Sequence, residues 1–494
     1  MTRFSAQHPA RDWGGADLSF RQPRWVASRA GVGQSSRVFF SCWLIYTFFW
    51  TPYIVREHFP AIALMERGSL NVEGYADWSE DIFRGPQGGA YINNNPGASL
   101  LAAIPLLLLR PVFTAIDHWN QRRPKADLRT EEEPILTRAV GAKREIYFLA
   151  IAFATVAMVM APATAATAAY LCSCFAKIGV GPLAAAAAAL VYGLGTPVFF
   201  RAAHLNHNLL VCDAGFIALL WVWQSRLGFA QLVCAGLLSG FALLCDYSGI
   251  VVIGTVGAYV LLKSKRRAYA ALAFTAGLAP MIAALLIYQQ WAFGSFYHPS
   301  QHFMTPTAPT ARGYRGIDWP SPALLWANFF DARFGLFAYC PLLALAFAAP
   351  FVKRLKFRVP RLETSVLFGY FFLFVLFCAA NQYSWFQPLT GFRYLVPVVP
   401  ALAILALQTC QIFQPWLRWV LAIATLGQSF IMSAGHQNSL AGNLRWFWTH
   451  GLELPWMYRF WEIGAGVTWL WPAVAFSFLL AAIGLIWLPA LRGL

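Results

Sequence analysis

The stretch AYAALAFTAGLAPMIAALLIY, from Ala268 to Tyr288, decides the fold class of this chain. Its 21 residues contain no charged side chain, and a helix of that length covers the roughly 30 Å hydrocarbon core of a bilayer. The basic cluster KSKRR, from Lys263 to Arg267, comes directly before it. Similar apolar runs recur along the chain, so the sequence predicts an all-α polytopic membrane protein.

The composition of the whole chain agrees with this prediction. Of 494 residues, 59% are hydrophobic and 12% are charged, whereas a soluble domain carries roughly 25% charged residues. The net charge of +16 is assigned to cytoplasmic loops, so no nucleic-acid partner is expected. The nine cysteines lie mostly in apolar runs, and their spacing predicts neither a disulfide framework nor a zinc site.

Loop charges determine the predicted topology. If all of the about thirteen apolar runs crossed the membrane, the basic clusters KSKRR and KRLKFRVPR (Lys353 to Arg361) would face outward, against the positive-inside rule. One earlier run must therefore lie along the interface, and Pro96 to Ile116 is the best candidate because Pro105 interrupts it. A bundle of about twelve spanning helices results, with both termini cytoplasmic.

This topology divides the chain into three regions. Residues 1–36 form a cytoplasmic tail, and residues 37–410 form a transmembrane region whose first external loop, residues 56–145, carries interfacial helices. Residues 411–494 supply the last helices and one more external loop. Nearly all unusual polar residues fall on the outer face, which is where we expect the chemistry.

Three carboxylates stand close together in the first external loop, at Asp77, Glu80 and Asp81. A carboxylate within hydrogen-bond distance of an alcohol can accept its proton during a reaction. A solvated acidic loop explains the same spacing, so the residues alone leave both interpretations open.

The stretch YINNNPG, from Tyr91 to Gly97, supplies further candidates. Helix capping accounts for one of its asparagines but not for three. The phenol of Tyr91 and the amides of Asn94 and Asn95 are therefore candidate ligands for a phosphate or for sugar hydroxyls.

A second polar group lies at the end of the run GLGTPVFFRAAHLNHN, from Gly193 to Asn208. His204 and Asn208 are spaced i, i+4 on a helix, and His207 lies near them. Asp246 ends another apolar run, and ionisable residues so close to a membrane interior are functional candidates by default. The alternative for the histidines is a structural polar role.

Two later external stretches complete the candidate set. The stretch from Tyr288 to Met304 contains His298 and His302 beside a Gly-Ser turn, as in a lid. The stretch from Asn381 to Pro400 contains Trp385 and Arg393. Arg393 at the outer mouth of a helix can bind a phosphate with two hydrogen bonds, although an anchor in the interface explains it equally well.

In order and membrane placement, several short motifs resemble those of the bacterial polytopic glycosyltransferases of the GT-C superfamily, close to the protein-mannosyltransferase-like and aminoarabinose-transferase-like group. The motifs are Glu66 to Leu70, Glu80-Asp81, Tyr91 to Leu101, Gly195-Thr196-Pro197 with His207, Asp246-Tyr247, Phe293-Gly294-Ser295, Gly335-Leu336-Phe337 and Gly391 to Pro397. The resemblance spans about Arg56 to Pro400 and no single motif decides it.

The resemblance implies a GT-C-like bundle and transfer of a sugar from a polyprenyl-phosphate donor outside the cytoplasm. It implies that an acidic residue of the first loop is the base, with Asp81 as the best match and Asp77 or Glu80 as substitutes. It also places Asn95, His207 and Arg393 near the donor. Relatives often have Lys at the position of Asn95, so the resemblance implies that phosphate binding here depends more on Arg393, Arg84 or His207.

The expected protein is thus an inverting glycosyltransferase of a bacterial inner membrane, acting on the periplasmic side. Its acceptor is a glycan, a lipid or a protein hydroxyl. No cofactor is expected, because Asp77 and Asp81 on a loop do not establish a divalent-metal site. A lipid-linked-sugar flippase and a polysaccharide ligase are the alternatives, although no inverted repeat supports transport.

Overall fold

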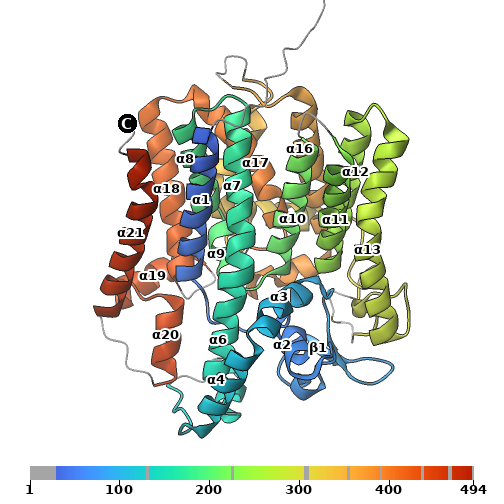
Figure 1. Cartoon of the computed structure of the whole chain (residues 1–494), viewed down its shortest axis with the longest axis vertical. Coiled ribbons are helices and arrows are strands. Elements are labelled where there is room, and N and C mark those ends of the chain that lie inside the picture. Colours follow the sequence, from blue (N-terminus) through green and yellow to red (C-terminus); the bar gives the residue numbers. More distant parts are fainter. Residues whose placement is uncertain are drawn as a thin grey trace, which may run out of the picture.

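The computed structural model describes residues 29–129, 133–223, 227–304, 307, 311–352, 357–389, 392–435, 439–464 and 470–491. Long helices run side by side along the molecule (Figure 1). The elements of the first external loop gather at one end, and the C-terminal end of α21 (Leu470–Leu491) lies at the other. Residues 1–28 of the predicted tail lie outside the described residues.

Five described helical segments are long and apolar enough to cross a membrane. They are Glu145–Lys177, Arg267–Phe293 (α13), Arg361–Ala380 (α16), Pro415–Ala434 (α18) and Trp471–Ala490 within α21. The first joins α6 (Glu145–Thr155) to α7 (Ala161–Lys177) through a π-helical turn. These lengths and compositions support an all-α membrane protein.

Further helices complete the bundle. α1 (Arg29–Phe48) leads from the end opposite the first loop down to that loop (Figure 1). The others are α8 (Pro182–Gly195), α9 (Val198–Ala202), α10 (His207–Val222), α11 (Phe229–Cys245), α12 (Gly249–Lys263), α14 (Pro322–Phe330), α15 (Leu336–Tyr339), α17 (Val399–Thr409), α19 (Leu440–His450) and α20 (Pro455–Glu462). Short 3-10 segments lie at Glu73–Tyr75, Ser300–His302, Pro341–Ala348, Gln382–Leu389, Val396–Val398 and Cys410–Ile412.

The first external loop combines helices with a small hairpin. After α2 (His58–Arg67), β1 (Ile82–Arg84) pairs antiparallel with β2 (Ala90–Ile92). Its turn includes Gly88 and Gly89 at φ 83° and 80°, a backbone region that favours glycine. The hairpin is a local departure from the predicted all-α fold.

The apolar stretch after the hairpin is sharply bent. α3 (Gly97–Leu108) and α4 (Arg110–Arg122) meet at 82°, and α5 (Pro134–Gly141) follows. The predicted break at Pro105 is wrong in position, because Pro105 lies inside α3 and the axis turns at Leu109. Pro111 lies in the first turn of α4, where a residue without an N–H is tolerated.

Glycines bring α11 and α13 into close contact. A Cβ on Gly236 would lie 2.0 Å from the Phe274 carbonyl oxygen, and one on Gly277 would lie 1.9 Å from the Val233 carbonyl oxygen. Gly236 and Gly240 form the small-xxx-small spacing that lets membrane helices approach closely. This contact therefore depends on residues without side chains.

The C-terminal part of the chain packs against the first loop. Arg459 of α20 forms ion pairs with Glu133 and with Glu462, the latter at 2.9 Å. The Arg129 N–H donates to the Glu462 carbonyl at 3.1 Å. Arg459 is 4% exposed, so removing either partner of these buried pairs would leave a charge poorly compensated.

Gly236→Ala should lower stability, because the new methyl group would overlap the carbonyl of Phe274. Overpacking of this kind costs about 1–3 kcal/mol, which thermal unfolding of the purified protein in detergent would detect. Gly254→Ala on α12 is the matched control, since no atom lies within 4 Å of its Cβ position. Equal melting temperatures for the two variants would contradict the predicted contact.

Candidate functional site

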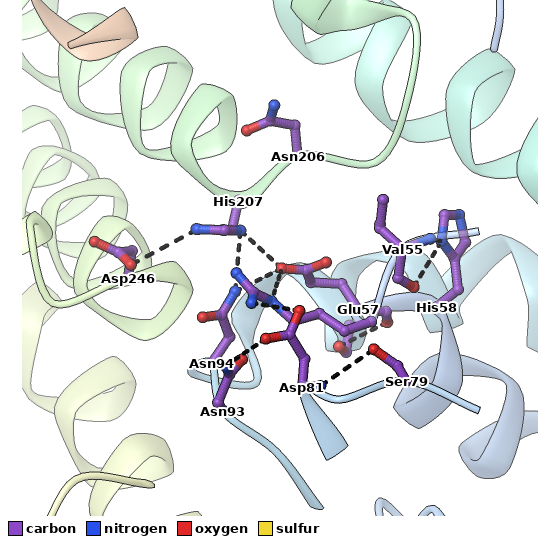
Figure 2. Close-up of polar contacts among 12 residues, drawn as sticks. Val55, Glu57, His58, Ser79, Asp81, Asn93, Asn94, Asn206, His207 and Asp246 are labelled. Atoms are coloured by element: carbon purple, nitrogen blue, oxygen red, sulfur yellow. Dashed lines mark hydrogen bonds and ion pairs between the residues drawn. The ribbon is translucent and has the colours of Figure 1, made fainter. Parts of the chain in front are cut away.

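Glu57 lies at the centre of a polar network (Figure 2), and Arg56 precedes it in the stretch between α1 and α2. Arg56 Nε lies 3.3 Å from Glu57 Oε1, and Arg56 Nη1 lies 2.8 Å from Asp81 Oδ2. Glu57 is 2% exposed, whereas the Asp81 side chain is 44% exposed. One guanidinium therefore links a buried carboxylate to an open one.

Glu57 also contacts groups from two distant segments. Its Oε1 accepts a hydrogen bond from Asn94 Nδ2 at 2.5 Å and lies 2.7 Å from His207 Nδ1. His207 begins α10, where the Asn206 side chain caps the helix. The other ring nitrogen, Nε2, lies 3.8 Å from Asp246 Oδ2. The imidazole thus stands between two carboxylates, as Figure 2 shows.

The hairpin fixes Asp81 in place. Asn93 Nδ2 donates to Asp81 Oδ1 at 2.7 Å, and the Asn93 N–H donates to the Asp81 carbonyl at 3.1 Å. The Asp81 N–H in turn donates to Ser79 Oγ at 3.2 Å. Asp81 is therefore oriented by Arg56 and Asn93 while its side chain stays accessible.

Electrostatics keep the buried pair charged. Burial raises the pKa of the Glu57 carboxyl. The charges and hydrogen bonds of Arg56 and His207 lower it by a larger amount, so this pKa lies well below its usual value. Burial lowers the pKa of Arg56, whereas Asp81 and Glu57 raise it above its usual value. The pair is therefore ionised at neutral pH, and the hydrogen bonds of Asn94 and His207 compensate its burial.

Two more arginines lie near this network. Arg201 of α9 is 4% exposed, and burial followed by the charge of Arg393 lowers its pKa to about 9. Arg393 Nη2 donates to the Tyr394 hydroxyl at 3.1 Å. Its Nε is buried and has no hydrogen-bond partner among the described residues. Because neighbouring cations repel each other, an anion bound between them would be stabilised.

Other buried polar atoms near the network lack partners among the described residues. Asn208, next to His207, is 1% exposed, and neither its amide nitrogen nor its amide oxygen is hydrogen-bonded. The same is true of Asn93 Oδ1 and of Ser248 Oγ, two residues after Asp246. Such groups are costly when unsatisfied, so they favour a polar ligand or water at this site.

The stretch after α13 is tied to the hairpin. Ser300 Oγ and Gln301 Nε2 both donate to the Asn93 carbonyl, at 3.0 and 2.8 Å. The rings of His298 and His302 stack on each other at 4.2 Å between centroids. Ser300 and Gln301 therefore contact the backbone of Asn93, the residue that orients Asp81. The two predicted histidines, His298 and His302, stack on each other instead.

Of the predicted site residues, the structure brings Asp81, Asn94, His207 and Asp246 together. Asp77 and Glu80 are exposed, outside this network. The Asn95 amide instead donates to the Leu243 carbonyl at the end of α11, at 2.8 Å. Among the described residues, no group of three His, Cys, Asp or Glu side chains could hold a metal ion.

Three further predicted residues have other surroundings. Tyr91 packs against Trp291 and Phe293 in an aromatic cluster. Trp385 is 37% exposed. His204 precedes α10, so its expected i, i+4 pairing with Asn208 on one helix is wrong; the chain turns between α9 and α10 instead. Burial and Arg201 hold the pKa of His204 well below its usual value.

Sequence reasoning missed Arg56, Glu57 and Arg201. Arg56 and Glu57 are the first two charges after the first apolar run, and Arg201 lies inside another apolar run. A charge at such a place is unfavourable unless it is paired or functional. That cost was the available signal, and it was applied to Asp246 but not to these residues.

Comparisons with known proteins assign no family to this chain. No family model, no curated protein and no solved structure matches it. The interpretation of the site therefore depends on its own residues.

The buried His58 should make stability depend on pH. Burial lowers the pKa of its ring from 6.5 to about 4, so the unfolded chain binds a proton in this range and the folded chain does not. Stability is then complete above pH 6.5 and falls by about 3 kcal/mol as the pH drops to 4. Melting temperatures measured from pH 7 to 4 would show this loss.

His58→Gln should flatten that pH profile, while losing some stability at neutral pH with the hydrogen bond to Thr155. His118→Gln, at an exposed position of α4, is the matched control and should keep the wild-type slope. An unchanged slope in His58→Gln would refute the assignment.

Proposed function

We propose that this protein is a membrane glycosyltransferase that uses a polyprenyl-phosphate sugar as donor. The observation that carries the proposal is that an accessible carboxylate and two cations occur in the same region. Asp81, which Arg56 and Asn93 hold in place, supplies a base. The cations Arg201 and Arg393 supply an anion site. The resemblance to GT-C glycosyltransferases supports the same assignment.

In the proposed reaction, a hydroxyl oxygen of the acceptor attacks the anomeric carbon of the donor sugar. The bond from that carbon to the phosphate oxygen breaks, and its electron pair leaves with the polyprenyl phosphate. Asp81 takes the hydroxyl proton, and the configuration at the anomeric carbon inverts. Because the phosphate is already a good leaving group, the protein supplies mainly position and charge.

The other residues have supporting roles in this scheme. Arg56 orients Asp81, and its second partner Glu57 keeps the guanidinium in place. Arg393 and Arg201 stabilise the departing phosphate. His207 and Asp246, with the amides of Asn94 and Asn208, line the polar side of the site and suit sugar hydroxyls.

The proposal includes a bundle of about twelve spanning helices in a bacterial inner membrane, with the site on the periplasmic side and both termini cytoplasmic. It is supported by the common location of the first-loop elements at one end of the bundle, away from the end of α21 (Figure 1). The bent α3 and α4 then form the segment along the interface, and the basic clusters lie inside. The partners are the lipid-linked donor, the bilayer and an acceptor glycan, lipid or protein.

Asp81→Asn should reduce sugar transfer by about 100-fold or more, because it keeps the shape of the side chain and removes the base. Transfer from radiolabelled polyprenyl-phosphate sugars would be measured with purified protein in lipid and a membrane extract as acceptor source. Asp77→Asn and Glu80→Gln are the matched controls, since both residues are exposed, and should retain activity.

Full activity in Asp81→Asn would move the base to another carboxylate. Loss of activity in a folded Glu57→Gln variant would then identify Glu57 as the base. No transfer from any monosaccharide donor by folded wild-type protein would contradict the proposal and favour the ligase or transporter alternative.

Arg393→Gln should raise the Kd of polyprenyl phosphate about 10-fold or more, because a hydrogen bond to a charged group contributes about 1.5–3 kcal/mol. Binding would be measured by calorimetry with the purified protein in lipid nanodiscs. Arg333→Gln is the matched control, since its side chain is 62% exposed and already pairs with Asp331. Equal affinities in the two variants would place the phosphate elsewhere.

A further inference from the structure

A polar cavity lies in the first external loop, apart from the Glu57 network. It has a volume of about 360 Å³ and is bounded by the end of α2, one face of α4 and the start of α6. Ligand sites commonly have volumes of about 300–1,000 Å³. Glu57 precedes α2 and Glu66 stands near its other end, so the length of this 10-residue helix, about 15 Å, separates the cavity from the network.

The lining indicates the kind of ligand that the cavity suits. It carries balanced charges together with a hydroxyl and an amide, from Glu66, Arg110, Thr114, Asp117, Gln121 and Arg144. An anionic ligand would meet the two carboxylates, and a cationic ligand would meet the two guanidinium groups. A neutral ligand with many hydroxyls suits both, because each hydroxyl donates and accepts hydrogen bonds.

Arg144 holds the wall of the cavity in place. Its Nη2 lies 2.5 Å from Glu66 Oε1, its Nε lies 3.0 Å from Asp117 Oδ1, and its Nη1 donates to the Tyr75 hydroxyl at 2.8 Å. These contacts join α2, α4 and the start of α6. The polar groups are thus oriented before a ligand binds, which lowers the entropic cost of binding.

The shape of α4 indicates the direction from which a ligand comes. Arg110, Thr114, Asp117 and Gln121 follow one face of this helix over about 16 Å, which is longer than one sugar ring. The opposite face carries Val112 and Trp119, 51% and 54% exposed, and suits the surface of a bilayer. The cavity then opens away from the lipid, toward water.

We propose that this cavity binds a neutral oligosaccharide, as a subsite for the distal part of an extended acceptor glycan. Saccharide binding stands on the cavity alone, whereas the role of that saccharide as acceptor rests on the proposed glycosyl transfer. An acceptor held at both places would bring its reacting hydroxyl to Asp81 at a high effective concentration.

The test uses the purified full-length protein in lipid nanodiscs, applied to an array of soluble neutral and acidic oligosaccharides, with calorimetry on the neutral ligands that bind. The double variant Thr114→Val with Gln121→Ala should weaken their binding at least 10-fold, because both residues are exposed in the cavity and remove hydrogen bonds. The control is Thr137→Val with Gln87→Ala, which removes an exposed hydroxyl and an exposed amide elsewhere in the same loop and should bind as wild type.

The results separate this inference from the proposed function. Asp81→Asn should bind the oligosaccharide normally while losing transfer. Absence of neutral oligosaccharide binding, a preference for acidic ones, or equal affinity in the two double variants would overturn the subsite even if transfer is observed. Oligosaccharide binding lost in the cavity variant, in a protein that transfers no sugar from any lipid donor, would support the subsite and overturn the proposed function.

Discussion

The arrangement of the candidate site depends on one guanidinium that pairs with two carboxylates in different surroundings. Arg56 compensates the buried charge of Glu57 and at the same time orients Asp81, which remains accessible. Burying an isolated carboxylate is very unfavourable, whereas a buried pair with further hydrogen bonds is tolerated. Asn94 and His207 supply those hydrogen bonds, and they bring the hairpin region and α10 to the same point. The hairpin region and α10 thus meet at the site because both supply hydrogen bonds to the buried charge of Glu57.

Much of the fold could be predicted from the sequence, because the hydrophobic length of a helix is set by the bilayer. The segments Ala268 to Tyr288 and Ile146 to Ala176 are apolar over enough residues to be recognised without any tertiary information. The hairpin around Gly88 was not predicted, and the bend at Leu109 was predicted at Pro105 instead. They depend on left-handed backbone at glycine and on how α3 packs against its neighbours, which composition does not encode.

The site could be predicted only in part, for a different physical reason. Asp81 was recognised as one of three carboxylates in the first loop, and Asn94, His207 and Asp246 were recognised as polar residues near the ends of apolar runs. Arg56, Glu57 and Arg201 were not, because their significance lies in how far they are from water once the helices pack, and burial is a property of the assembled bundle. The Asn95 amide donates to the Leu243 carbonyl, a backbone partner that no sequence motif indicates.

The ion pair between Glu133 and Arg459 joins positions 326 residues apart in the chain. During synthesis at about 5–20 residues per second, roughly 16–65 s pass between the appearance of one partner and the appearance of the other. For that interval the first loop lacks the buried cation that later compensates the charge of Glu133. The loop that carries Asp81 can therefore reach its final packing only after α20 has been synthesised, so the completion of this loop is a late event in biogenesis.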